Sequence, residues 1–277
     1  MLRCIKMDLY RMFHTKALYI IWMIMAAGVI FSTYMSKIDE ENIRNESSAV
    51  ELEQEALSVG MQVTLNIEEG QSVTVDDQVY ANLKGTFVTL FLVIFAVLFS
   101  TADINSGYIK NVGGQVKRRE SLILSKVVSL FIFTAVTMAL YFILQVLFQR
   151  IFFGNMIFRD AVSLLRYFGV HILLNYAMVL VCMALSIIFK HNTISMSLSI
   201  CLIMKLQVII YSFIDKIIGK MGAADFQLIE HTVIGKMSLL SLNSDNRQML
   251  LACLTAVIFG AAAALITGLV FKRRDIV

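Results

Sequence analysis

The sequence predicts an all-α membrane protein: six transmembrane helices, an amphipathic interfacial helix at the N-terminus and a small extracellular insertion. Of its 277 residues, 58% are hydrophobic and only 16% are charged, whereas soluble domains carry about one-quarter charged residues. Several apolar stretches approach or exceed the length of about 20 residues that crosses a hydrocarbon core as a helix. The chain also lacks proline, so long helices have no obligate breaker.

The apolar stretches divide the chain into alternating spans and polar segments. The predicted spans are residues 17–35, 86–102, 127–148, 168–189, 193–213 and 248–271. The polar segments are the N-terminal residues 1–16, the insertion 36–85, the loop 103–126, the segment 214–247 and the tail 272–277.

Lysine and arginine give the expected orientation. The N-terminus, the loop 103–126, the pair Lys190–His191 and the tail together carry 13 basic residues and four acids. The segments on the other side carry ten basic residues and 16 acids. Because cytoplasmic loops are enriched in Lys and Arg, we expect both termini in the cytoplasm of a bacterial plasma membrane protein. The pI of about 8.8 therefore indicates topology, and no nucleic-acid partner is expected.

Residues 1–16 place apolar side chains at helical spacing. Leu2, Ile5, Leu9, Met12 and Phe13 share one face, and basic residues lie on the other. This pattern predicts an amphipathic helix lying in the inner membrane interface. The alternative is a frayed basic N-terminus that only sets the topology.

Two segments are expected on the outer side. Residues 36–85 carry 11 acids and three basic residues, and we expect them to be water-exposed. Within them, residues 46–57 read as a polar helix, and the alternation of Val63, Leu65 and Ile67 with Val73 and Val75 predicts a hairpin. The insertion either receives a cationic substrate or is a solvated cap. Residues 214–247 predict short helices that enter the outer leaflet.

No catalytic motif is present. The sequence lacks G-x-x-x-x-G-K-[ST], so this chain is not expected to bind ATP or another cofactor, and it has no C-x-x-C metal-binding spacing. Two short patterns are similar to membrane-embedded proteases of the CAAX type, namely Glu40-Glu41-Asn42-Ile43-Arg44 and His171-x-x-x-Asn175. The first falls in the acidic outer segment, and no second intramembrane histidine accompanies the other. This alternative is therefore disfavoured, because a proton-transfer site needs several converging groups.

The loop 103–126 contains an acid, then Gly-x-Ile-Lys, then a basic cluster and Ser-Lys as the next span begins. The residues concerned are Asp103, Gly107, Ile109, Lys110, Lys117, Arg118, Arg119, Ser125 and Lys126. This order resembles the permeases of the ABC-2 class, which include bacterial peptide-antibiotic immunity and peptide-toxin exporters. The resemblance extends to the N-terminal amphipathic helix, the six spans and the outer segment before the last span. Many relatives carry a proline before the arginine, which is absent here, and the outer insertion is larger than in minimal members.

The resemblance implies an exporter subunit that moves a peptide-like or amphipathic substrate. Its implied partners are a separate cytoplasmic ATP-binding-cassette ATPase, which would hold ATP and Mg²⁺, and a second copy or a homologous permease. The four cations from Lys110 to Arg119 cannot easily enter lipid and suit docking onto an acidic partner groove. A short helix held there would transmit motion of the ATPase to the second and third spans. The alternatives are a basic loop that only sets topology, and a non-transporting sensor or immunity scaffold.

Polar and small residues inside the spans are the remaining candidates. Lys205 near the middle of the fifth span costs about 2.5–3.5 kcal/mol to insert, so we expect it to face a partner helix, a wet cavity or a helix break. It either lines a translocation path or extends outward from a span that ends early. Asn175 and Gln145 are candidates for the same path or, more simply, for hydrogen bonds between helices. The row Gly260, Ala264 and Gly268 predicts close helix packing.

Overall fold

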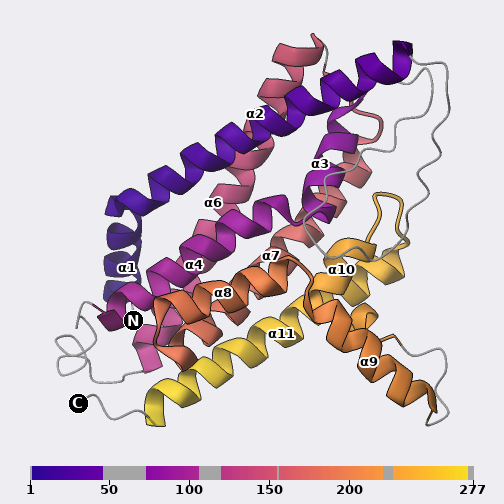
Figure 1. Ribbon diagram of the computed structural model, residues 1–277. Helices are drawn as coiled ribbons and strands as arrows, with labels where there is room; N and C mark the ends of the chain where they lie inside the picture. The colour runs from indigo at the N-terminus through magenta and orange to yellow at the C-terminus, as the bar shows by residue number, and fades with distance from the viewer. Residues whose placement is uncertain (1, 46–72, 106–119, 155, 221–226, 274–277) are drawn as a thin grey trace.

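The computed structural model describes residues 2–45, 73–105, 120–154, 156–220 and 227–273, and every element within these ranges is a helix. Four single helices are long and apolar enough to cross a membrane (Figure 1). They are α2 (Lys16–Asn45), α6 (Glu120–Phe153), α7 (Ala161–Phe189) and α11 (Asn246–Arg273).

Two bent pairs of helices are each a further candidate, either as a broken span or as a re-entrant loop. The first joins α3 (Val75–Lys84) to α4 (Phe87–Asn105) with a bend of 48°. The second joins α8 (Asn192–Ile203) to α9 (Gln207–Lys220) with a bend of 62°, and α9 points away from the bundle (Figure 1). The described residues therefore contain four candidate spans, or six if each bent pair counts as one.

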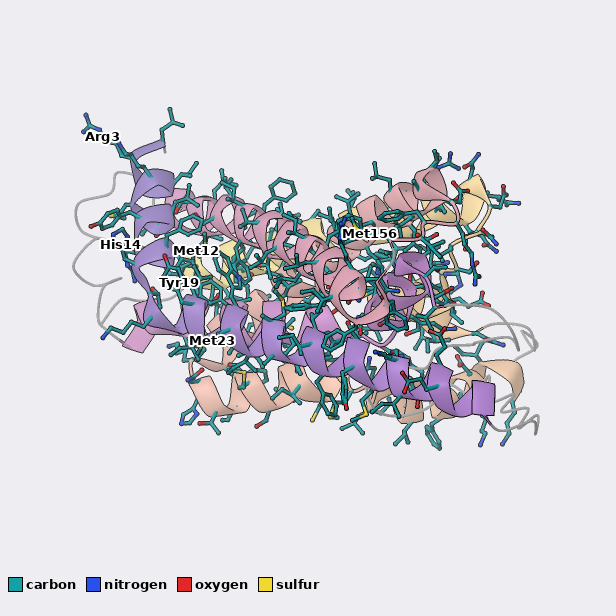
Figure 2. The ribbon with its side chains drawn as sticks, turned by 90° about the horizontal axis from the view of Figure 1, so that it is seen from above. Arg3, Met12, His14, Tyr19, Met23 and Met156 are labelled. Atoms are coloured by element: carbon teal, nitrogen blue, oxygen red, sulfur yellow. The ribbon has the colours of Figure 1, made fainter. Side chains whose placement is uncertain are left out.

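Three short helices complete the described chain: α1 (Leu2–His14), the 3₁₀ helix η1 (Leu228–His231) and α10 (Val233–Leu239). Helix α1 turns sharply away from α2 at one end of the bundle (Figure 2). Met12 points into the protein and is fully buried, whereas Arg3 projects outward. The predicted N-terminal helix is thus present in the structure, and part of its apolar face packs against α6. Its contact with a membrane surface stays a prediction.

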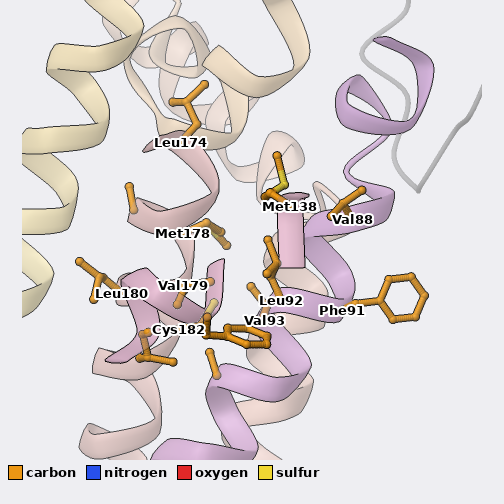
Figure 3. Close-up of a cluster of buried hydrophobic side chains, with 14 of the residues drawn as sticks. Val88, Phe91, Leu92, Val93, Met138, Leu174, Met178, Val179, Leu180 and Cys182 are labelled. Carbon is orange, nitrogen blue, oxygen red and sulfur yellow. The ribbon is translucent and has the colours of Figure 1, made fainter. Parts of the chain in front are cut away.

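The core lies between α4, α6 and α7, with α11 packed along α7. Leu92 and Val93 of α4, Met138 of α6 and Val179 of α7 converge there (Figure 3). The rings of Phe95 and Phe133 lie 4.3 Å apart between centroids and join α4 to α6. Burying these side chains fixes how the helices pack, because interiors are close-packed and tolerate little change of volume.

The prediction that residues 36–85 are entirely water-exposed is wrong. Helix α2 continues to Asn45, and Val75–Lys84 forms α3, in which Val79 and Asn82 are fully buried. Since Val75 begins a helix, the predicted hairpin is wrong at this position. The predicted polar helix at 46–57 and the first half of the hairpin lie outside the described residues.

The fifth predicted span is not one continuous helix. The helical hydrogen bonds break between Ile203 and Gln207, and the second half continues as α9 to Lys220, past the predicted end at residue 213. The following segment does contain short helices, η1 and α10, and α10 packs against α7 and α3. Its position relative to a lipid leaflet stays a prediction.

Of the predicted packing row on α11, Gly260 lies at a close contact between helices, and Gly268 has no closely neighbouring helix in the described chain. A Cβ added to Gly260 would lie 3.5 Å from Leu180 and 3.8 Å from the Cα of Ala177, so α11 and α7 meet closely there. A Cβ on Gly268 would meet nothing within 4 Å, and Ala264 is only half-buried. The buried stripe of α11 instead contains Met249, Ala252, Ala256, Gly260, Ala263, Thr267 and Phe271.

Candidate functional site

The breaks in the two bent pairs meet inside the protein. The Oγ1 of Thr86, between α3 and α4, donates a hydrogen bond of 3.3 Å to the carbonyl oxygen of Ile203, where α8 ends. We call this contact, with the residues 84–86 and 203–207 around it, the junction. Interrupted helices that meet within a bundle expose backbone polar groups and are typical of binding sites in transporters.

The backbone at the junction is strained. Thr86 has φ = 60° and Lys205 has φ = 59°, and they are two of the three non-glycine residues with positive φ in the described part of the chain. A left-handed conformation costs about 1–3 kcal/mol at such residues and is unusual for a β-branched threonine. Gly85, which would adopt it without strain, has φ = −70° instead. The surrounding packing must therefore hold both residues in place.

Two lysines belong to the junction. Lys84 lies two residues before Thr86, and Lys205 lies two residues after Ile203, so the hydrogen bond between Thr86 and Ile203 brings the two segments together. Lys84 is exposed and Lys205 is half-buried. Lys84 Nζ also donates to the hydroxyl of Tyr80 at 3.1 Å and lies 5.2 Å from the centre of its ring. Lys205 thus lies in a helix break, one of the surroundings that the sequence predicted.

A buried hydrogen-bond network holds α3 inside the bundle. The amide of Asn82 donates to Gln145 Oε1 of α6 at 3.1 Å, and its Oδ1 accepts from Ser32 of α2 at 3.2 Å. Gln145 Nε2 in turn donates to Thr33 Oγ1 at 3.1 Å. Gln145 therefore joins α2, α3 and α6, as the prediction of hydrogen bonds between helices requires.

Asn175 has the same kind of role between α4 and α7. Its Oδ1 accepts a hydrogen bond of 2.7 Å from Thr89, and its Nδ2 donates to the carbonyl of His171 at 2.8 Å. Asn175 and His171 are fully buried, and the ring centroids of His171 and Tyr167 lie 4.3 Å apart. The described residues contain no group of three or more His, Cys, Asp or Glu side chains that could hold a metal ion.

The N-terminus of α3 is attached to the connection between α6 and α7. Thr74 and Asp77 form a reciprocal capping box, and Asp77 lies 3.4 Å from the guanidinium of Arg159. The buried Asp76 accepts hydrogen bonds from the backbone N–H groups of Arg159 at 2.7 Å and Asp160 at 3.1 Å. These contacts compensate for burying the Asp76 carboxylate, which is otherwise unfavourable.

Asp160 in turn caps α7. Its carboxylate accepts hydrogen bonds from the backbone N–H groups of Val162 at 3.0 Å and Ser163 at 3.2 Å. Hydrogen bonds from the side chain and backbone of Ser163 hold the pKa of Asp160 below its usual value.

The opposite end of α4 and the start of α6 are also joined. Lys126 is buried and donates from Nζ to the carbonyl oxygen of Phe99 at 3.2 Å, with the ammonium 4.8 Å from the centre of the Phe99 ring. Ser125 donates to the buried carboxylate of Asp8, which connects α6 to α1. Thr101 Oγ1 donates to Asn192 Oδ1 at 3.3 Å and connects α4 to α8. We call this set of contacts the base.

Most of the predicted coupling residues lie outside the described part of the chain: Gly107, Ile109, Lys110, Lys117, Arg118 and Arg119. Asp103 belongs to the last turn of α4, and Lys126 lies in the base. The junction was not predicted as a site, although Thr74-x-x-Asp77 is a sequence signal for the start of α3. Searches of protein-family models and of curated proteins give no match to this chain.

Proposed function

We propose that this chain is the transmembrane subunit of an ATP-binding-cassette exporter whose ATPase is a separate polypeptide. Two copies, or one copy and a homologous permease, would form the path for a peptide-like or amphipathic substrate. ATP and Mg²⁺ would bind to the partner ATPase. The proposal is supported by the four to six candidate spans and by the loop sequence from Asp103 to Lys126.

One structural observation carries the proposal: Lys126 joins the two ends of the basic loop. The described parts of α4 and α6 end at Asn105 and begin at Glu120, and the Lys126–Phe99 hydrogen bond joins them near these ends. A push on the loop would therefore move α4 and α6 together. Helix α4 extends for 19 residues, or about 28 Å, from the base to the junction, so it can carry this motion to the helix breaks.

The test uses the purified full chain together with any ATP-binding-cassette ATPase that a neighbouring reading frame encodes. We predict that reversing the loop charges with Lys117→Glu, Arg118→Glu and Arg119→Glu abolishes co-purification of the ATPase. It should also remove at least nine-tenths of the ATP turnover that depends on the complex. The physical reason is that an acidic partner groove would then face three acids.

The matched control reverses three exposed cations that the proposal places on the outer side of the membrane. The changes are Lys216→Glu, Lys220→Glu and Arg247→Glu. This control should leave the complex and its turnover unchanged. Unaltered complex formation in the loop variant would show that the loop is not the docking element. A chain that binds no ATPase at all would instead favour the non-transporting scaffold.

A further inference from the structure

We propose that the junction binds the phosphate group of an amphipathic anion between Lys84 and Lys205. This inference rests on the membrane placement in the proposed function but not on the ATPase. Neither lysine has an ion-pair partner among the described residues, although both belong to candidate spans. Two lysines without ion-pair partners, one at each of two helix breaks that a hydrogen bond joins, favour a negatively charged ligand.

The depth of the junction strengthens this argument. Ile203 lies 11 residues beyond Asn192 at the base, which is about 16 Å along α8. Thr86 lies 15 residues from Thr101, or about 22 Å along α4. With the base at the cytoplasmic surface, both distances fall within a hydrocarbon core of about 30 Å. The lysines would therefore lie in its outer half.

The helix ends do not neutralise the lysines. Lys84 belongs to the last turn of α3 and Lys205 follows the end of α8, so each lies near a partial negative charge of about half a unit. However, α4 and α9 begin at the same place, and their N-termini contribute similar partial positive charges. The net charge of the two lysines and the four helix ends therefore remains close to two positive charges. The negative charge of a phosphate group would balance it.

Gln207 supplies an independent observation. It is the first residue of α9, two residues after Lys205, and only 8% of its surface is exposed. Both polar atoms of its amide are buried without a hydrogen-bond partner in the described protein. A buried amide without partners is costly and uncommon, and it is explained when a ligand supplies the missing hydrogen bonds. The Nε2 group of Gln207 donates, as the ammonium groups of Lys84 and Lys205 do, so a phosphate oxygen would supply the missing acceptor for Nε2.

The experiment measures binding to the purified full chain in a neutral detergent, without the ATPase. The probes are inorganic phosphate, phosphatidylglycerol and the zwitterionic phosphatidylcholine, each titrated while the thermal unfolding temperature is recorded. We expect phosphatidylglycerol or phosphate to raise this temperature, and Lys84→Gln or Lys205→Gln to weaken the binding at least tenfold. The control Lys216→Gln, Lys220→Gln should bind as the wild type does.

The two active probes distinguish the sources of the phosphate. Binding of inorganic phosphate alone identifies a soluble anion, and binding of phosphatidylglycerol alone identifies a lipid-like headgroup. The variants Lys84→Arg and Lys205→Arg should retain binding, which separates the charge from the fold. Binding that is equal in the glutamine variants, or equal for phosphatidylcholine and phosphatidylglycerol, would overturn the proposal while leaving the ATPase docking test intact.

Discussion

Replacing Gly235 with alanine is expected to destabilise the protein by about 3 kcal/mol or more. A Cβ on Gly235 would lie 1.7 Å from the carbonyl oxygen of Ile229, which is backbone and cannot rotate away. Overpacking in a well-packed site typically costs about 1–3 kcal/mol, and this overlap is more severe because a backbone segment must move. Helix α10 would have to separate from η1 and lose its packing against α7 and α3. Thermal unfolding of the purified chain measures the loss.

Gly169→Ala is the matched control. Gly169 also lies inside a helix, but a Cβ there would meet nothing within 4 Å. Alanine at this position should stabilise α7 by about 0.5–1 kcal/mol, because glycine is unfavourable in a helix interior. Equal unfolding temperatures for Gly235→Ala and the wild type would show that η1 and α10 do not pack as described.

Replacing Gln145 with leucine is the second large effect, and we expect a loss of about 2–3 kcal/mol. The substitution leaves the buried Asn82 amide without its acceptor on α6 and Thr33 without its donor. A buried polar group that loses its hydrogen-bond partner costs about 1–3 kcal/mol, and here both Asn82 and Thr33 lose one. The effect is measured as the change in unfolding free energy of the purified chain.

A double-mutant cycle makes this prediction specific. Asn82→Leu combined with Gln145→Leu removes both partners, so the double variant should lose at least about 1 kcal/mol less than the sum of the single losses. Gln248→Leu, on the exposed surface of α11, is the control and should change stability by less than about 0.5 kcal/mol. Additive losses in the cycle would contradict the hydrogen bond between Asn82 and Gln145.

Hydrophobic length predicted the long helices well and their ends poorly. The stretch 127–148 lies inside α6, but that helix continues for several residues at both ends, from Glu120 to Phe153. The reason is physical: apolar length reports the thickness of a hydrocarbon core, while a helix continues wherever its backbone hydrogen bonds are satisfied. The same extension occurs in α2, which continues to Asn45.

Helix α3 was not predicted because its sequence is polar. Asp76, Asp77, Gln78 and Asn82 favour a water-exposed segment when they are read alone. In the structure, Asn82 finds partners on α2 and α6, and Asp76 accepts from backbone groups that precede α7. Such long-range partners cannot be read from local composition, although the capping box at Thr74 was a signal for a helix start.

The candidate site was predicted in part. Lys205 was recognised because a lysine within an apolar stretch is costly, and the break between α8 and α9 occurs at that residue. The partner segment was not recognised, because Lys84 and Thr86 fell at the border between a predicted insertion and a predicted span. Their proximity to Lys205 arises only from the packing of α4 against α8.

The role of Gly235 had no sequence signal at all. A glycine next to Lys236 is ordinary in a polar segment, and its close approach to Ile229 depends on how η1 and α10 fold back on each other. A close backbone approach of this kind is a property of the folded chain, and local pattern does not encode it.

Labelling of single cysteines in intact cells that express the chain tests the central proposal, that the loop 106–119 faces the cytoplasm of a membrane-spanning chain. The four native cysteines are first replaced with alanine, and Met156→Cys or Lys117→Cys is then introduced. Met156 is exposed just beyond the end of α6 at Phe153, whereas the base lies near the start of that helix, at Lys126. A membrane-impermeant maleimide should label Met156→Cys in intact cells and Lys117→Cys only after the membrane is opened. Labelling of Lys117→Cys in intact cells, with Met156→Cys protected, would contradict the account.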